Sequence, residues 1–225
     1  LLKLSFWTGL AFFGGALFQQ TGIVTSSVTN SGFLTSLYVV LTPFMAWVVH
    51  RRVPTGWVWV AVALSAVGTW LLGGGTLSAF SKGDVLVAIS AVFWAAYVVL
   101  VGMGSGEGMP SAFTALQFVV VGLLGLLGTG LFEQTTLAGL WLATPDLLFV
   151  GVLSSALMFT LFAAAMKSTQ ATETAVIVST ESLFAALAAW LFLEERLPAL
   201  GWLGAVLLVA ATLIVHLPVN KKGRR

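Results

Sequence analysis

Long apolar stretches recur along this chain, and short polar or glycine-rich turns separate them. Their length matches the roughly 20 residues that a helix needs to cross the hydrocarbon core of a bilayer. Apolar residues run continuously in these stretches rather than alternating, so the pattern predicts helices and not the strands of a membrane barrel. The expected fold is an all-α polytopic membrane helix bundle with eight spans, at residues 4–24, 31–49, 55–73, 85–103, 111–132, 147–166, 173–193 and 199–217.

The composition makes lipid the solvent for most of the chain. Of 225 residues, 59% are hydrophobic and 8% charged, and there is no cysteine. A soluble domain carries roughly 25% charged residues, so this chain has too few charges to cover a water-facing surface. His50 and His216, with no cysteine, are too few for a histidine- or thiolate-based centre. The sequence therefore predicts no metal site and no cofactor, and nothing in it is typical of an enzyme.

The basic residues are distributed unevenly between the two ends of the eight spans. One face would carry Lys3, Arg51, Arg52, Lys167, Lys221, Lys222, Arg224 and Arg225, and the other only Lys82 and Arg196. Positively charged loops stay in the cytoplasm. We therefore expect a multi-pass protein of the cell (plasma or inner) membrane with both termini cytoplasmic. The basic tail at 218–225 then lies against anionic lipid, and no nucleic-acid partner is expected.

Two parts of the chain resemble each other. Residues 34–49 align with residues 177–192 at a constant offset. Identities fall at Ser36, Ala46 and Trp47, which match Ser179, Ala189 and Trp190. An odd number of expected spans separates Arg52, which follows the first stretch, from Arg196, which follows the second, so the two stretches should cross the membrane in opposite senses. Inverted repeats of this kind are typical of secondary transporters, which bind substrate near the midplane between the repeats.

The same stretches resemble a known family. Residues 30–54 look like the fourth helix and following loop of an EamA-type permease of the drug/metabolite transporter superfamily. Residues 175–202 are similar to the matching part of that family's second repeat, with Glu181 and the Glu195-Arg196 pair in the places where the family commonly has a glutamate and a Glu-Arg loop. Residues 82–100, with the Gly-Asp pair near their start, resemble the opening of that repeat.

The resemblance implies an inverted-repeat architecture of three plus five helices. It predicts a partial first repeat at 1–75, a complete second repeat at 83–217 and a basic cytoplasmic tail at 218–225. Because the family has ten helices, we expect that the first two are absent from this chain, which begins with leucine rather than methionine.

The function implied by the resemblance is secondary transport of a small metabolite or drug by alternating access, driven by a proton or exchange gradient. The alternative is a truncated, transport-inactive membrane fragment that acts only by associating with other membrane subunits. The expected partners are a small-molecule substrate and the lipid bilayer, and the sequence leaves homodimerisation open.

Glu181 is the sharpest candidate for a functional residue. It stands about eight residues inside its span, which places it roughly 12 Å deep at the helical rise of 1.5 Å per residue. A charge at that depth should face the bundle or a wet cavity. It would contact substrate or carry a proton. The alternative is a protonated or hydrogen-bonded glutamate that only holds helices together.

Other polar and aromatic residues inside the spans complete the candidate substrate site. The second span is unusually polar, and the first and fifth spans contain glutamines that need partners in hydrocarbon. Trp94 and Tyr97 lie three residues apart on one helix face and would form an aromatic wall. Besides these two and Glu181, the expected substrate-binding residues are Tyr38, Asn30, Thr42, Gln117 and Gln20. Hydroxyls that bond to their own helix are the alternative for the serines and threonines.

Small residues recur on one face of the fifth span. Gly122, Gly125 and Gly128 follow one another at three-residue spacing. Small residues let two helix backbones approach closely in a membrane. The pattern therefore predicts that this face packs against another helix.

Overall fold

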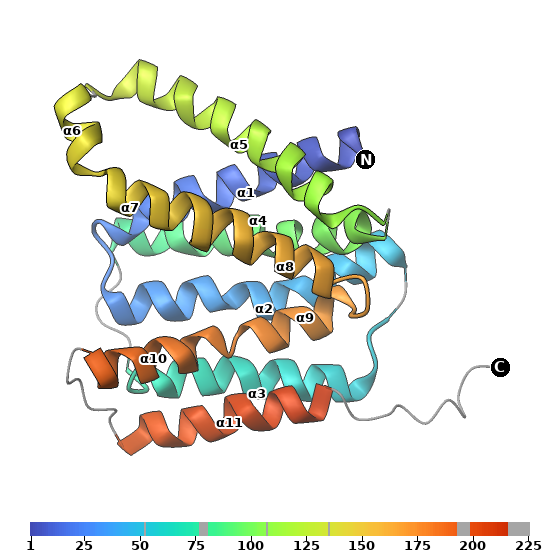
Figure 1. The fold of residues 1–225 in the computed structure, drawn as a ribbon. Helices are drawn as coiled ribbons and strands as arrows, with labels where there is room; N and C mark the ends of the chain where they lie inside the picture. Colours follow the sequence, from blue (N-terminus) through green and yellow to red (C-terminus); the bar gives the residue numbers. More distant parts are fainter. Residues whose placement is uncertain (52, 77–80, 107, 135, 193–198, 216–225) are drawn as a thin grey trace. The chain divides into compact units, whose positions relative to one another are not determined.

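The computed structural model describes residues 1–51, 53–76, 81–106, 108–134, 136–192 and 199–215 (Figure 1). All regular elements among these residues are helices. They are α1 (Leu2–Ile23), α2 (Val28–His50), α3 (Gly56–Leu72), α4 (Lys82–Ser105), α5 (Pro110–Phe132), α6 (Leu137–Leu142), α7 (Thr144–Leu148), the π-helix η1 (Phe149–Leu157), α8 (Met158–Ala165), α9 (Ala171–Val178), α10 (Glu181–Phe192) and α11 (Ala199–Val215). The prediction of an all-α bundle is confirmed.

Five helical stretches in the described part of the chain are long and apolar enough to cross a membrane. These are Thr29–His50, Lys82–Ser105, Pro110–Phe132, Thr144–Ala165 and Ala171–Phe192. Two shorter apolar helices are Gly56–Leu72 and Ala199–Val215. Each predicted span therefore has a helix at its place, including α1, which its two glutamines make less apolar. Arg52, Arg196 and the tail at 218–225, which support the predicted orientation, lie outside the described residues.

Local signals set the ends of the helices that build the site. The Ser27 hydroxyl accepts a hydrogen bond of 3.1 Å from the backbone N–H of Asn30 and so caps α2. At the other end, Arg51 adopts a left-handed conformation with a φ of 52°, and its N–H bonds to the Trp47 carbonyl. Pro54 follows shortly, and a proline cannot continue a helix. The polar turn residues of the sequence therefore explain why α2 begins and ends where it does.

The described helices form two compact units, and two helices contribute to both. Unit 1 consists of Leu1–Gly14 and Leu100–Thr169, and unit 2 consists of Gly15–Val99 and Gln170–Arg225. This division follows contacts within the fold. It does not test the predicted repeat boundaries at 1–75 and 83–217, which follow sequence similarity and remain a prediction.

In unit 2, α3 and α11 pack at very short range. Figure 1 shows them side by side and running in opposite directions, as their neighbours α2 and α9 also do. A Cβ atom added to Gly204 would lie 2.5 Å from the Gly68 carbonyl oxygen, so these backbones nearly touch. Leu208 beside them is fully buried. Glycine at this contact allows two helices to approach more closely than side chains would permit.

In unit 1, aromatic rings hold α1, α5 and α8 together. The ring centroids of Phe12, Phe118 and Phe159 are 5.0 to 5.6 Å apart in all three pairs. Most other apolar side chains of α5 are exposed, as expected for surfaces that face lipid. Within unit 1 nothing lies within 4 Å of a Cβ added to any of the three glycines predicted to pack, Gly122, Gly125 and Gly128. The predicted close contact on that face is therefore not present in this unit.

Candidate functional site

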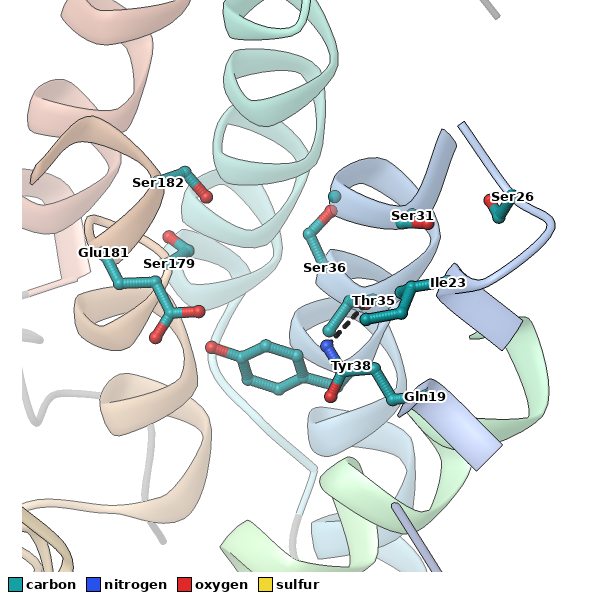
Figure 2. Close-up of a pocket in the computed structure, with 11 residues that line it drawn as sticks. Gln19, Ile23, Ser26, Ser31, Thr35, Ser36, Tyr38, Ser179, Glu181 and Ser182 are labelled. Atoms are coloured by element: carbon teal, nitrogen blue, oxygen red, sulfur yellow. Dashed lines mark hydrogen bonds between the residues drawn. The ribbon is translucent and has the colours of Figure 1, made fainter. Parts of the chain in front are cut away.

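A cavity of about 440 Å³ lies within unit 2. The C-terminal end of α1, the first half of α2 and the junction between α9 and α10 border it (Figure 2). Its lining residues are Gln19, Ile23, Ser26, Ser31, Gly32, Thr35, Ser36, Tyr38, Ser179, Glu181 and Ser182. All except Ile23 and Gly32 carry a polar side-chain group, although 59% of the chain is hydrophobic. Polar side chains therefore gather at this place in an otherwise apolar protein.

The span that contains Glu181 is broken in its middle. The Ser179 hydroxyl donates a hydrogen bond of 2.6 Å to the Val176 carbonyl, and the Thr180 hydroxyl donates one of 2.6 Å to the Ile177 carbonyl. Hydroxyls that bond back to nearby carbonyls compete with the helical ladder. A turn at Ser179 and Thr180 results, and Glu181 is the first residue of the second half-helix, α10. The break therefore turns Glu181 out of a regular helix surface and into the cavity wall.

A neighbouring helix fixes the position of this break. The Ser65 hydroxyl on α3 donates a hydrogen bond of 2.5 Å to the Ser179 hydroxyl. Ser65 is fully buried and Ser179 is 3% exposed, so their hydroxyls bond to protein groups and not to solvent. Together with the bond from Ser179 to the Val176 carbonyl, this forms a continuous chain of donors from α3 to α9. The junction is thus tied to the core of unit 2.

Glu181 and Tyr38 approach each other from opposite walls of the cavity. Figure 2 shows the Tyr38 hydroxyl and the Glu181 carboxylate pointing toward one another. Tyr38 is 8% exposed, and its buried hydroxyl has no hydrogen-bond partner among the described residues. The hydroxyl of Ser31, another lining residue, is buried and unpartnered in the same way. Buried polar groups normally have partners, so these two hydroxyls are left with hydrogen-bonding capacity that the described residues do not use.

Gln19 forms a fixed polar wall at the α1 side of the cavity. Its amide oxygen accepts a hydrogen bond of 2.9 Å from the Trp94 indole N–H, and its amide nitrogen donates one of 3.2 Å to the Thr35 hydroxyl. These bonds join α1 to α4 and to α2. Because an amide in hydrocarbon needs partners for both of its ends, the cavity wall here is stiff rather than adaptable.

A second carboxylate stands behind the cavity. Asp84 at the start of α4 is fully buried and accepts hydrogen bonds from the Ser26 hydroxyl and, over 3.0 Å, from the Asn30 amide. It also accepts from the backbone N–H of Ser81, whose hydroxyl accepts from the N–H of Asp84, so the two residues form a capping box for α4. Ser26 lines the cavity. The Asp84 charge is therefore separated from the cavity by a single hydrogen bond.

The structure brings only some of the predicted site residues together. Glu181 and Tyr38 line the cavity, whereas Asn30 is outside the lining and its side-chain amide donates a hydrogen bond to Asp84. Thr42 is buried and bonds to the Tyr38 carbonyl over 2.7 Å, which is the own-helix alternative for a threonine. The remaining predicted residues are outside the lining. Trp94 donates a hydrogen bond to Gln19, and Tyr97 is buried against Trp94 with their ring centroids 5.9 Å apart. Gln20 is exposed, and Gln117 is buried in unit 1.

Sequence reasoning missed several lining residues, chiefly Gln19, Ser31, Ser179 and Ser182. Gln19 and its neighbour Gln20 have the same chemistry, and only packing decides which of them turns inward. For Ser179 a signal was present. It aligns with Ser36 in the internal repeat, and both serines line the cavity. In the described part of the chain no group of three or more His, Cys, Asp or Glu residues could hold a metal ion.

Comparisons with known proteins agree with these features. A model of the EamA-like transporter family matches residues 81–217. An uncharacterized transporter from Archaeoglobus fulgidus is 31% identical over 226 residues, which covers 96% of this chain and 70% of that protein. A solved crystal structure superposes with a TM-score of 0.78 at 16% identity, over 97% of this chain and 78% of the other. That likeness shows a shared helical fold.

Proposed function

Because this chain belongs to the EamA-like transporter family and is a multi-pass membrane transporter, we propose that it carries a small metabolite by alternating access through the cavity of unit 2. The observation that carries the proposal is the unpartnered hydroxyl of Tyr38, which points toward the Glu181 carboxylate across the cavity (Figure 2). A volume of about 440 Å³ falls in the range of about 300–1,000 Å³ that is usual for small-molecule sites. The cavity is therefore large enough for a metabolite and polar enough to bind one.

The position of the cavity also supports this proposal. Tyr38 lies ten residues after the start of α2, which places it about 15 Å from that end by helical rise. Glu181 stands at the break between α9 and α10, near the middle of the span Ala171–Phe192. Substrate sites of secondary transporters lie at this depth and are often built by broken helices.

The internal symmetry gives a reason for alternating access. Ser36 and Ser179 align in the repeat, so Tyr38 and Glu181, each two residues later, occupy equivalent positions. The helices that carry them run in opposite directions in Figure 1. Two inverted elements that meet at one site can exchange their conformations, which opens the site to one side and then to the other. The half-helix α10, joined to α9 by a turn, is the element that we expect to move.

Single-cysteine labelling tests the access mechanism. The chain has no cysteine, so Ser182→Cys introduces one thiol into the cavity. In proteoliposomes, a membrane-impermeant maleimide should label it from either side, because the cavity opens to both in turn. A matched variant, Ser168→Cys, lies outside the cavity near the end of α8 and should react from one side only. If Ser182→Cys also reacts from one side only, alternating access is wrong.

Counterflow in proteoliposomes tests transport itself. Vesicles loaded with a mixture of unlabelled amino acids, nucleosides and amines should accumulate at least one of the same compounds in radiolabelled form. Glu181→Gln removes the cavity charge at nearly constant size and should lower that uptake at least tenfold. Repeating the assay with an imposed pH gradient separates proton coupling from exchange. A chain with no saturable uptake and one-sided labelling would instead fit a membrane subunit that acts by association.

A further inference from the structure

The charge in the described lining of the cavity is negative. Glu181 is the charged residue of its lining, and none of the described lining residues is basic. The Asp84 carboxylate adds a second negative charge behind Ser26. In a site with low dielectric constant such charges act strongly on a ligand, because little solvent screens them. The cavity should therefore attract cations and repel anions.

The broken helix does not reverse this sign. The N-terminus of a helix carries about half a positive charge, which alone would favour an anion. Here the C-terminal end of α9 lies next to the N-terminal end of α10, separated only by Ser179 and Thr180. Their opposite partial charges offset each other at the junction. The full charge of Glu181 at the first position of α10 then decides the local field.

The hydrogen-bonding groups match a ligand that offers donors. A carboxylate only accepts hydrogen bonds, and a hydroxyl oxygen can also accept them through its lone pairs. An ammonium group carries N–H donors and no acceptor, so it can donate to the Glu181 carboxylate and to the unpartnered hydroxyl of Tyr38 that faces it. An organic amine has the chemistry that these groups leave unsatisfied.

We propose that the cavity of unit 2 binds a small organic ammonium ion, with Glu181 as its counter-ion and the Tyr38 hydroxyl as a further acceptor. This proposal rests on the proposed function, because it names the class of compound that the transport cavity takes. It goes beyond the family assignment, which specifies no substrate.

Three probes of similar size and different charge test this proposal. The purified full chain in lipid nanodiscs is equilibrated by dialysis with radiolabelled benzylammonium, benzamide or benzoate at neutral pH, and binding to empty nanodiscs is subtracted. Benzylammonium should bind saturably and at least tenfold more tightly than the other two. Equal or tighter binding of benzoate or benzamide, or no saturable binding of benzylammonium, overturns the proposal.

Variants of the two carboxylates on the same span locate the binding. Glu181→Gln should weaken benzylammonium binding at least tenfold, whereas Glu181→Asp keeps the charge and should retain the preference for the cation. Glu173→Gln is the matched control. Glu173 lies in the capping box of α9 outside the cavity, and glutamine preserves that cap. Its affinity should stay within twofold of the wild-type value. Unchanged binding in Glu181→Gln contradicts the proposal.

A flux measurement separates this proposal from the transport function. If benzylammonium binds in a Glu181-dependent way but the proteoliposomes carry none of the probes, the cation site stands and the transport proposal fails. If the vesicles carry benzamide or benzoate and Glu181→Gln does not alter the flux, transport stands and the cation site is overturned.

Discussion

Tyr38 and Glu181 align with each other in two similar stretches of the sequence, 34–49 and 177–192, and their side chains face each other across one cavity (Figure 2). Each follows its aligned serine, Ser36 or Ser179, by two residues. In an inverted repeat, equivalent residues near the symmetry axis lie close together by construction. The repeat has kept the position but not the chemistry, since one side supplies a phenol and the other a carboxylate. Tyr38 lies within the continuous helix α2, whereas Glu181 begins α10 after a break, so the two sides of the site differ in backbone as well as in charge.

Removing the phenol hydroxyl should weaken substrate binding without changing the fold. Tyr38→Phe deletes an orphaned buried hydroxyl and keeps the ring. A neutral hydrogen bond contributes about 1 kcal/mol, so the KM for whichever counterflow probe the wild type takes up should rise about fivefold. Tyr97→Phe is the control, because Tyr97 is a buried tyrosine outside the lining and its replacement should leave the KM unchanged. Equal KM values for Tyr38→Phe and the wild type would remove Tyr38 from the site.

Breaking the bond between α3 and the helix junction should destabilise the protein. Ser65→Ala removes the donor to Ser179, and we expect a loss of about 1 kcal/mol in the free energy of unfolding. Chemical denaturation of the purified chain in detergent measures this loss. Ser90→Ala removes an equally buried hydroxyl that bonds only within its own helix, to the Val87 carbonyl, and should cost less. A larger loss for Ser90→Ala would show that Ser65 does not hold the junction.

The contact between α3 and α11 predicts opposite effects of one substitution at two glycines. In Gly204→Ala the new methyl group would meet the Gly68 carbonyl and Leu72 at 2.5 Å, so the helices must separate. Such overpacking costs about 1–3 kcal/mol. In Gly125→Ala nothing in its unit lies within 4 Å of the new methyl group. Alanine also favours a helix over glycine by up to about 1 kcal/mol. Thermal unfolding should therefore show a lower midpoint for Gly204→Ala and an equal or higher one for Gly125→Ala.

The distribution of basic residues predicts the orientation of the chain. Arg51→Cys and Lys82→Cys place single thiols at the end of α2 and at the start of α4, with α3 between them, and both positions are exposed. We expect an impermeant maleimide to label Lys82→Cys in intact cells, and Arg51→Cys only after the cytoplasmic side has been opened, because basic loops stay inside. Lys167→Cys should behave like Arg51→Cys. Labelling of Arg51→Cys and Lys82→Cys from the same side would contradict a membrane crossing between them.

Much of the fold was predictable because the bilayer constrains it so strongly. A segment in hydrocarbon must satisfy its own backbone groups, so apolar stretches of the right length have to be helices. The predicted span at 111–132 and the observed helix Pro110–Phe132 differ by one residue at their start. The glycines on that helix were predicted to pack, but close contacts between helix backbones formed at Gly68 and Gly204 and at Gly22 and Gly83 instead. The spacing of small residues along one helix does not show which other helix packs against it in the folded protein.

The sequence by itself determined the membrane environment, the places of the spans and the similarity between residues 34–49 and 177–192, since hydropathy and identities at a constant offset are local properties. It also singled out Glu181, because burying a charge in hydrocarbon is costly and such residues commonly mark functional sites. Only the tertiary structure decided that the helix breaks at Ser179, that Gln19 rather than Gln20 lines the cavity, and that Asn30 bonds to Asp84. Those outcomes depend on hydrogen bonds between helices far apart in the sequence, and a polar side chain in a membrane turns toward whichever partner folding brings within reach.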